Sequence, residues 1–423
     1  MRILVLSNLY PPDFIGGYEL CCRQAVDALL ARGHEVRVLT TAPRTPVPPV
    51  PHVRRTLQLT DIWNQYCIGK SNPLALEMAE VQALQINAFN VHSLITELEE
   101  FRPDVVYLWL LTGVGGLGLV ACLQYLRVPW VWHLGDPVPW LLCKRGAAGI
   151  PALVHEFERQ IQGDYLACSQ QLLNEIQNSG IRLSGDVEII PNWVVGQIPA
   201  ERSAYLPEGK LRIVNAGQLA RHKGVDLVIK AAQLLRHDGY DNFIIDIYGN
   251  ELDNEFSDMV RRHKLGDCVS FQGVRTQAEL MRLYGQYDVF AFPTWAREPF
   301  GCAPLEAAAR GCVPLLSQLC GISEWFVHRV HCLKIERTAE SLARALREVL
   351  EGRVDLESLG RRVSTVVRRD FHLEALLPRI ERALGRAAKR PRTGGGTAAQ
   401  AYRMALLAEK LAYVLIQESA RAA

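Results

Sequence analysis

Residues 211–249, LRIVNAGQLARHKGVDLVIKAAQLLRHDGYDNFIIDIYG, decide the fold. An apolar strand pattern at 211–217 is followed by a helical apolar period over 225–239 and by a second strand pattern at 243–249. Strand–helix–strand units of this kind form parallel sheets through right-handed crossovers. We therefore predict an α/β domain, in which ligands bind beyond the carboxyl ends of the strands.

A second alternation of the same kind precedes this segment. Strand patterns at 3–7 and 35–40 flank a helical pattern at 18–31, and a long helix is expected over 74–101, before further strands. The alternation lapses at 192–209 into Pro, Gly and polar residues, which is typical of a domain boundary. We expect two Rossmann-like domains, 1–195 and 196–370, that face each other across a cleft.

The C-terminal part of the chain is predicted to be helical. We expect a crossover helix at 371–388, a flexible basic linker at 389–397 and a last helix at 398–423. Four apolar side chains form one stripe of that last helix at helical spacing: Met404, Leu407, Leu411 and Val414. The stripe predicts docking on the body of the protein, and a partner-binding helix is the alternative.

Composition excludes several classes of protein. The formal net charge of +2 gives no basis for nucleic-acid binding. Eleven scattered cysteines without a C-x-x-C motif indicate reduced core thiols. Residues 108–126 are uncharged over nearly the length of a membrane span, but their glycines favour a strand, a turn and a buried helix instead. We expect a cytoplasmic protein, and peripheral contact with the inner face of the membrane is left open.

The strongest chemical signal is REPFGCAPLEAAARGCVPL, residues 297–315. Glu298 and Glu306 flank a Phe-Gly turn and the start of an apolar helix. A helix N-terminus collects unpaired N–H groups that suit a phosphate, and carboxylates accept hydrogen bonds from sugar hydroxyls. Because "APLEAAARG" is mostly small and apolar, we expect Glu306 to have a fixed partner.

Three further places follow predicted strands. Gly16 and Gly17 end a loop that leads into a helix, where the backbone can approach an anion, although such glycines often serve only the turn. Lys223 and Arg221 precede the helix at 225–239 and could neutralise a diphosphate, or be solvated loop charges. His133 follows the strand "VPWVW" and is either a ligand contact or a core histidine.

In this order and spacing, the motifs resemble the retaining GT-B glycosyltransferases of the family 4 type. The resemblance covers roughly residues 1–385 and includes the E-x7-E signature as "EPFGCAPLE". It implies two Rossmann-like domains, a nucleotide sugar held mainly by the second domain, and last helices that cross back to the first.

The resemblance also implies roles for individual residues. Glu306 matches the carboxylate that binds the ribose hydroxyls, and Glu298 matches the carboxylate near the donor sugar. Lys223 matches a phosphate-binding lysine, and His133 matches a histidine near the donor sugar. The remaining donor-binding positions that it implies are Gly16, Gly17, Phe300 and Gly301.

One departure concerns Gln218, which stands where the family usually has an arginine. Arg221, from the same loop, is the candidate substitute. Losing one preorganised donor to a developing charge costs on the order of 3 kcal/mol in a transition state.

The expected function is transfer of a hexose from a nucleotide sugar, UDP- or GDP-linked, to a hydroxyl acceptor with retention of configuration. No metal or other cofactor is expected, because no D-x-D motif ends a predicted strand and no His/Cys cluster has ligand spacing. A non-catalytic nucleotide-sugar-binding subunit and a sugar-nucleotide epimerase are the alternatives. The acceptor is a sugar, a lipid-linked or a small molecule, and the Pro-rich stretch 44–73, with Arg54, Arg55, Trp63 and Tyr66, is a candidate contact.

Overall fold

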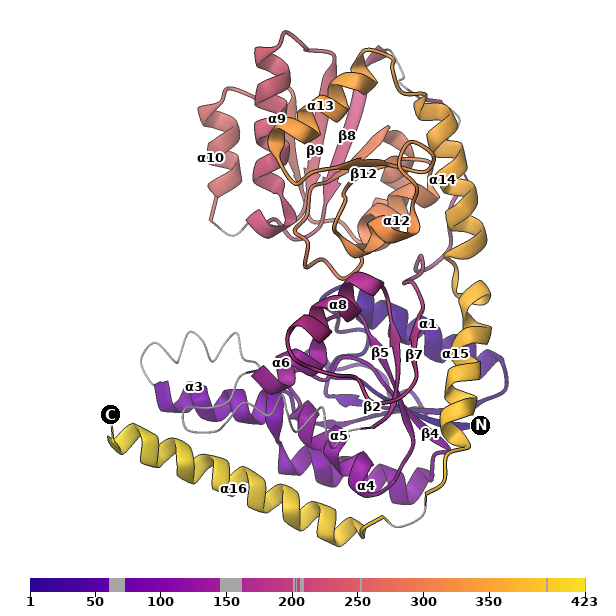
Figure 1. Cartoon of the computed structure of the whole chain (residues 1–423), viewed down its shortest axis with the longest axis vertical. Helices are drawn as coiled ribbons and strands as arrows, with labels where there is room; N and C mark the ends of the chain where they lie inside the picture. The colour runs from indigo at the N-terminus through magenta and orange to yellow at the C-terminus, as the bar shows by residue number, and fades with distance from the viewer. Residues whose placement is uncertain are drawn as a thin grey trace. The chain divides into compact units, whose positions relative to one another are not determined.

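The computed structural model describes residues 1–60, 73–144, 162–200, 202, 204–205, 209–251, 253–392 and 395–422. Within these ranges the chain forms two compact units (Figure 1). Unit 1 contains residues 1–168, 172–190 and 377–423, and unit 2 contains residues 169–171 and 191–376. The expectation of two parallel-sheet Rossmann-like domains is confirmed, and the chain end returns to unit 1.

Unit 1 is built on a seven-stranded sheet of order β3-β2-β1-β4-β5-β6-β7, in which every neighbouring pair is parallel. The strands are β1 (Arg2–Leu6), β2 (Glu35–Thr41), β3 (Val53–Leu57), β4 (Val105–Leu108), β5 (Trp130–Leu134), β6 (Asp164–Ala167) and β7 (Val187–Ile189). The inner strands are continuous apolar runs because helices cover both faces of a parallel sheet. The helices are α1 (Gly17–Ala31), α3 (Pro73–Glu80), α4 (Ala88–Phe101), α5 (Gly116–Tyr125), α6 (Val138–Lys144), α8 (Gln170–Asn178), α15 (Leu373–Ala388) and α16 (Ala398–Ala422), of which α8 and α15 each begin in unit 2.

The prediction of one long helix over 74–101 is wrong in its middle. After α3 the chain forms a π-helical turn, η1 (Val81–Gln85), and then an extended stretch at Ile86 and Asn87 before α4 begins. The break accommodates Gly115, whose N–H donates to the carbonyl of Ala83 at 3.0 Å. A Cβ at Gly115, which has φ +71°, would lie 2.4 Å from the Asn87 nitrogen, so the two segments approach too closely for any other residue.

Unit 2 repeats the architecture with a six-stranded parallel sheet of order β10-β9-β8-β11-β12-β13. The strands are β8 (Leu211–Ala216), β9 (Phe243–Tyr248), β10 (Val269–Gly273), β11 (Val289–Phe292), β12 (Val313–Ser317) and β13 (Leu333–Ile335). The α-helices are α9 (Val225–His237), α10 (Glu255–Arg262), α11 (Gln277–Leu283), α12 (Cys302–Ala309), α13 (Ala339–Leu350) and α14 (Leu356–Asp370), and the short 3-10 turns are η3 (Arg221–Lys223), η4 (Tyr284–Gln286) and η5 (Gly321–Trp325). The expected unit at 211–249 is confirmed as β8, α9 and β9.

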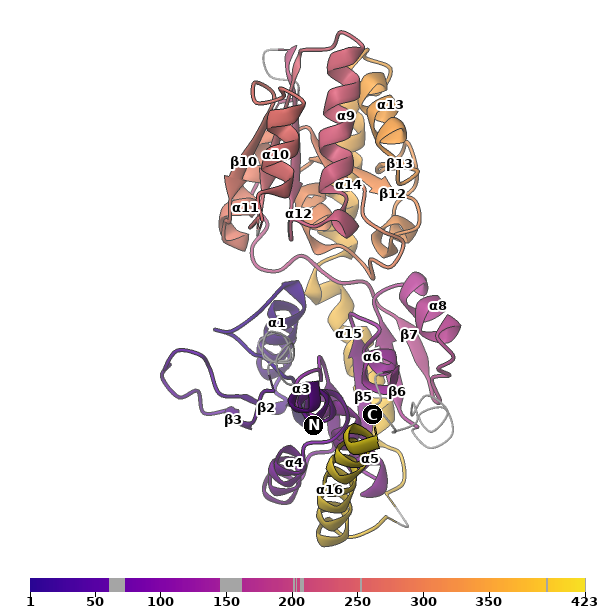
Figure 2. The same ribbon diagram turned by 90° about the vertical axis from the view of Figure 1, so that its left-hand side faces the viewer.

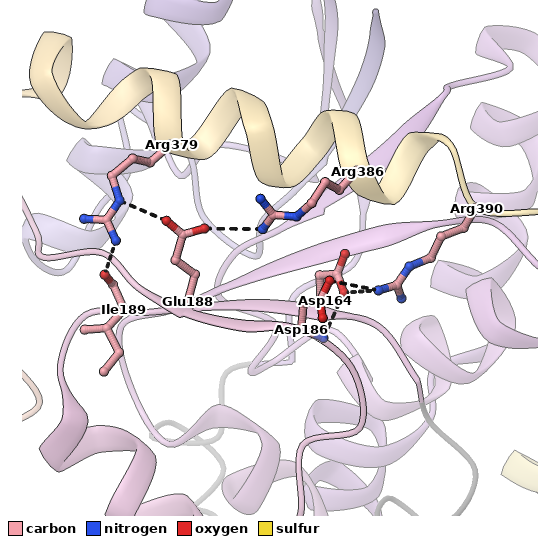
Figure 3. Close-up of polar contacts among 7 residues, drawn as sticks. All are labelled: Asp164, Asp186, Glu188, Ile189, Arg379, Arg386 and Arg390. Carbon is pink, nitrogen blue, oxygen red and sulfur yellow. Dashed lines mark hydrogen bonds and ion pairs between the residues drawn. The ribbon is translucent and has the colours of Figure 1, made fainter.

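Helix α15 is attached to the β6–β7 edge of the unit 1 sheet by charged side chains (Figure 3). The guanidinium groups of Arg379 and Arg386 both contact the Glu188 carboxylate of β7, at 2.9 and 3.3 Å. Arg390 pairs with Asp164 and lies 3.7 Å from Asp186. Arg390 belongs to the segment expected to be a flexible basic linker, and in the described part of that segment its side chain is bound to unit 1.

Helix α16 packs beside α4 and α3, as the two ribbon views show (Figures 1 and 2). The prediction that this helix docks on the body is therefore confirmed, but the predicted face is wrong. Ala401, Ala405, Ala412 and Ile416 are buried, whereas the stripe of Met404, Leu407, Leu411 and Val414 is exposed.

Candidate active site

The centre of the unit 2 sheet has the geometry at which α/β proteins bind ligands. Strands β8 and β11 are neighbours, and the chain runs from β8 toward β9 and β10 but from β11 toward β12 and β13. This reversal of strand order opens a crevice beyond the carboxyl ends of β8 and β11. The loops after these two strands hold Lys223 and Glu298, so the structure brings together two residues that are 75 positions apart.

A charged pair is the central feature of this crevice. Lys223 Nζ lies 2.5 Å from Glu298 Oε2, and the buried Thr294 hydroxyl donates to the same oxygen at 3.2 Å. The Glu298 side chain is largely buried, whereas that of Lys223 is partly exposed. The Lys223 side chain of the pair is therefore accessible to solvent, whereas Thr294 fixes the buried Glu298 carboxylate.

Gly224 explains how the two loops come so close. It has φ +80°, and a Cβ there would lie 2.2 Å from the carbonyl oxygen of Pro293. Only glycine permits this approach. The adjoining backbone is fixed by the Trp295 N–H, which donates to the carbonyl of His222 at 2.9 Å.

Arg221 is oriented differently from Lys223. Its guanidinium pairs with Glu255 in the first turn of α10 and lies 4.0 Å from Asp226 in the first turn of α9. These acids partly neutralise the cation that was considered a substitute for the usual arginine at 218. Gln218 itself is exposed in the loop after β8.

Glu306 lies in α12 and has the fixed partner that was expected. Gln277 Nε2 donates to Glu306 Oε1 at 3.1 Å and to the carbonyl of Val195 at 2.9 Å. The Glu306 residue is 7% exposed, and burial raises the pKa of its carboxyl to about 7, against the opposing effect of the Gln277 hydrogen bond. Glu306 is thus a carboxyl poised to change its charge near neutral pH.

Helix α12 begins beside these groups. Gly301 is its N-cap residue, with φ +107°, and the first-turn N–H groups of such a helix have no intrahelical acceptor and carry partial positive charge. The Phe300 side chain is buried, so only its backbone is available to a ligand. The expected contribution of Phe300 and Gly301 is therefore restricted to main-chain atoms and the helix end.

The unit 1 sheet has its own reversal of strand order, between β1 and β4. Gly16 and Gly17 lie where the loop after β1 enters α1. The Gly16 N–H already donates to Glu19 Oε2 at 3.0 Å, which is one half of a capping box. Burial raises the pKa of Glu19, whose carboxyl group occupies the end of the helix that was expected to attract an anion.

His133 lies at the end of β5 and is completely buried. Its Nδ1 is 2.7 Å from the Tyr107 hydroxyl, and its ring stacks on Trp109 with centroids 4.4 Å apart. Burial lowers the pKa of His133 to about 3, so the imidazole is neutral at physiological pH. Its carbonyl accepts a hydrogen bond from the Tyr18 hydroxyl.

The Pro-rich stretch 44–73 is described only in part. Arg55 donates to the carbonyls of Pro11 and Thr41, at 2.7 and 3.2 Å, and Arg54 lies 3.9 Å from Glu97. These arginines are engaged within unit 1. Trp63 and Tyr66 lie outside the described residues.

Several functional neighbours were missed in the sequence. Gln277, Thr294 and Glu255 each contact a predicted site residue, yet none has a motif of its own. Gln277 follows Thr276, which is the N-cap residue of α11 and forms a capping box with Glu279. This capping box indicates the start of a helix and gives no role to Gln277. The pairings of Gln277 with Glu306 and of Glu255 with Arg221 join residues 29 or more positions apart, so they are set by the fold and leave no local pattern, whereas Thr294 lies only four residues before Glu298.

The described residues also bear on metal binding and membrane insertion. Within the described ranges, no three His, Cys, Asp or Glu side chains are grouped as a metal site requires. None of the helices described is both long and apolar enough to cross a bilayer. The described cysteines are free thiols, and all of them except Cys302 are buried, as expected.

Comparison with known proteins covers most of the chain. Residues 16–193 match the model of the glycosyl transferase 4-like domain, and residues 198–364 match that of glycosyl transferases group 1. The glycogen synthase of Mycobacterium tuberculosis is 25% identical over 372 residues, which are 83% of this chain and 86% of that protein.

Two solved structures share the fold at 18% sequence identity. Sucrose-phosphate synthase from Thermosynechococcus elongatus superposes with a TM-score of 0.67 over 91% of this chain and 98% of its own. The HepE protein of Anabaena, solved in complex with UDP and glucose, gives 0.65 over 91% of this chain and 100% of its own.

Proposed function

The chain belongs to the group 1 glycosyltransferases, and from that premise we propose that it transfers a hexose from a nucleoside diphosphate sugar to a hydroxyl acceptor, with retention of configuration and without a metal ion. The observation that carries the proposal is the Lys223–Glu298 pair at the strand-order reversal of unit 2, beside the N-terminus of α12. A cation and a helix terminus suit a diphosphate, and carboxylates suit sugar hydroxyls.

The donor diphosphate would take over Lys223. In the free protein the ammonium is paired with Glu298, and the phosphate oxygens offer it more negative charge and a further partner in the α12 N-terminus. Glu298, held by Thr294, is then free to accept hydrogen bonds from the transferred sugar. When Lys223 exchanges Glu298 for the diphosphate, Lys223 binds one part of the donor and Glu298 becomes available to its sugar.

Glu306 would bind the ribose of the nucleotide. The Glu306 carboxyl has a pKa of about 7 in the free protein, and it is a better hydrogen-bond acceptor once it is ionised. Two ribose hydroxyls would stabilise the ionised form. Gln277 fixes one carboxylate oxygen and orients the group for this contact.

In the transfer step, the bond between the anomeric carbon and the diphosphate breaks toward an oxocarbenium-like state. The departing diphosphate gains negative charge, which Lys223 and the α12 N-terminus stabilise. The acceptor hydroxyl attacks from the same face, and the departing phosphate oxygen takes its proton. His133, neutral and buried, contributes shape and its backbone beside the donor sugar rather than a proton.

We propose a uridine diphosphate hexose as the first donor to test and a guanosine diphosphate sugar as the second. Support for the first is the Anabaena HepE structure, whose contents are UDP and glucose. The acceptor class is a carbohydrate or glycoconjugate hydroxyl. Gly16 and Gly17 remain proposed contacts of the diphosphate through their backbone.

A second candidate function is nucleotide-sugar binding without transfer. Gln218 removes the usual arginine, and the Arg221 guanidinium is paired with Glu255, so the loop after β8 offers less positive charge than the family pattern. Sugar-nucleotide epimerisation is a further alternative, and its product would be an isomerised donor.

The test is a donor screen followed by product analysis. UDP-, GDP- and ADP-sugars are ranked by thermal shift, and the best donor is incubated with and without simple sugar acceptors. Transfer with the anomeric configuration preserved, read by NMR, is the expected result. Binding without turnover would indicate the binding subunit, and isomerised donor without acceptor would indicate the epimerase.

A further inference from the structure

Helix α16 has two apolar faces, and only one of them packs on the part of the chain that the structure describes. The buried face consists of small side chains and one isoleucine: Ala401, Ala405, Ala412 and Ile416. The opposite face holds the larger side chains, Met404, Leu407, Leu411 and Val414, which are 55%, 69%, 54% and 49% exposed. Spacings of three and four residues align these four on one side of the helix.

The orientation of α16 is fixed, so the exposed stripe cannot turn inward. Ile416 and Ala412 pack on Val81 of η1, beside Met78 of α3. The Glu409 carboxylate accepts from the Ala88 N–H at the start of α4, at 3.1 Å, and from Gln82 at 2.9 Å. A helix rotated to bury its leucines would lose these bonds and expose Ile416.

Basic side chains follow one edge of the stripe. Arg403, Lys410 and Arg421 are exposed, and spacings of 7 and 11 residues place them on one line of the helix, next to the apolar side chains. No carboxylate of the described chain forms an ion pair with any of the three. Glu418 is the exposed acid on this face, and it lies one turn beyond Val414.

We propose that this face of α16 docks on an anionic lipid surface, with the four apolar side chains at the boundary between headgroups and acyl chains and the three cations among the lipid phosphates. An exposed apolar stripe bordered by Lys and Arg is the pattern of helices that lie in the interface plane. The attraction combines burial of apolar area with the interaction of each cation with the negative surface potential.

The same face is poorly suited to a second copy of this chain. A stable protein interface uses roughly 20–30 residues on each side, whereas this stripe offers four apolar side chains on one helix. Two copies would also bring their basic edges into one small contact. A lipid surface requires no complementary protein surface, and its phosphates match the edge.

This proposal goes beyond the glycosyltransferase activity and does not depend on it, because vesicle binding requires no donor. The full chain is sedimented with vesicles of phosphatidylcholine alone, or with about one third phosphatidylglycerol. We expect binding to the anionic vesicles only, weakened by salt as the surface potential is screened.

Two double variants separate the two contributions. Leu407→Gln with Leu411→Gln should lower the vesicle partition constant by at least about tenfold, and Arg403→Gln with Lys410→Gln by about thirtyfold at low salt. Matched controls in unit 2 are Val327→Gln, at an exposed valine, and Arg261→Gln with Arg262→Gln, at exposed arginines. The controls should bind as the unaltered chain does.

A third variant covers the case in which a double variant misfolds. Leu407→Trp keeps the face apolar, and its fluorescence should be quenched by vesicles whose acyl chains carry bromine, beyond the quenching of a Val327→Trp control. The proposal is overturned if the unaltered chain does not bind anionic vesicles, or if the double variant Leu407→Gln with Leu411→Gln binds them equally well. A dimer in light scattering that the leucine variant abolishes, without vesicle binding, would assign the face to a second copy instead.

Discussion

The two sheets share the same central strand order, but the polar groups at their two reversals are arranged differently. In unit 1, Gly16 donates to Glu19, and the ring of His133 is enclosed by Tyr107 and Trp109. In unit 2, Lys223 and Glu298 form a pair whose cation is accessible to solvent. A reversal of strand order provides a crevice, but it does not determine whether the groups there are already satisfied by the protein.

The two strand-order reversals differ in how easily their polar side chains can exchange a protein partner for a ligand. His133 cannot gain a proton near neutral pH and cannot turn without losing its stacking. Under the proposed function, Lys223 exchanges Glu298 for a phosphate at little cost, because both partners then gain ligand contacts. We infer that unit 2 supplies the charges for donor binding, whereas the polar groups at the reversal of unit 1 are already bonded within that unit.

The largest expected effect is at Lys223. Lys223→Gln removes the cation that meets the departing diphosphate, and kcat for transfer should fall by roughly 100- to 1000-fold. The matched control is Lys230→Gln, since Lys230 is an exposed lysine of α9 that, like Lys223, pairs with a largely buried carboxylate, here that of Asp226. A Lys223→Gln rate within a few-fold of the unaltered enzyme would break the comparison, because unit 2 would then not supply the essential charge.

Gly16→Ala tests whether the unit 1 loop touches the donor at all. The Gly16 backbone is extended and a Cβ there would have no neighbour within 4 Å, so the melting temperature should not change. If the backbone approaches the diphosphate, the methyl group should raise KM for the donor by about tenfold. Gly266→Ala, also without a neighbour within 4 Å, is the control. An unchanged KM would sharpen the comparison between the two units, because it would indicate that the Gly16 loop of unit 1 does not contact the donor.

Donor affinity should also depend on pH through Glu306. Its pKa is about 7 in the free protein, and ribose hydroxyls favour the ionised form, so binding lowers that pKa and releases a proton. The donor dissociation constant should therefore fall by about tenfold between roughly pH 6 and pH 8. Calorimetry on Glu306→Gln should show weaker binding without this dependence, and a dependence that survives in the variant would assign the titration elsewhere.

The same carboxyl gives a stability effect of opposite direction. The folded pKa of Glu306 exceeds that of an unfolded glutamate, so the folded state binds more protons between about pH 4.5 and pH 7. Unfolding free energy should fall by about 3 kcal/mol as the pH rises through this window, and Glu306→Gln should remove that loss. Denaturant melts at the two ends of the window measure it, and identical slopes with pH in both proteins would contradict it.

The smallest effect is expected at Tyr107. Tyr107→Phe removes the hydroxyl that meets His133 Nδ1 in the buried ring cluster, at a cost of about 1 kcal/mol and a few degrees in melting temperature. Tyr125→Phe, at an exposed hydroxyl that contacts Gln400, is the control and should melt as the unaltered protein does. A large loss of kcat with an unchanged melting temperature would break the comparison by giving the buried ring cluster of unit 1 a chemical role.

Much of the fold follows from the sequence because parallel sheets need continuous apolar strands that alternate with helices. The errors arose where a distant segment determines the outcome. The break between α3 and α4 depends on Gly115, which lies beyond the whole of α4 in the chain. The docked face of α16 depends on Glu409, which is bonded to Gln82 and Ala88 more than 300 positions away.

The site shows the same division. The positions of Lys223, Glu298 and Glu306 after strands or in a helix were predictable from local pattern, as was a partner for Glu306. The identity of that partner, Gln277, and the pairing of Arg221 with Glu255 depend on the fold. Hydrophobic periodicity likewise indicated an apolar stripe on α16 without indicating what covers it.

The central claim is that the donor nucleotide binds at the strand-order reversal of unit 2. The most direct measurement is calorimetric titration of the nucleoside diphosphate whose sugar ranks first in the thermal-shift screen, at about pH 8, where Glu306 is largely ionised. The account predicts that Lys223→Gln and Glu306→Gln each weaken binding by at least about tenfold while Lys230→Gln does not. Equal affinity in all four proteins, or no binding of any nucleoside diphosphate to the unaltered chain, would contradict it.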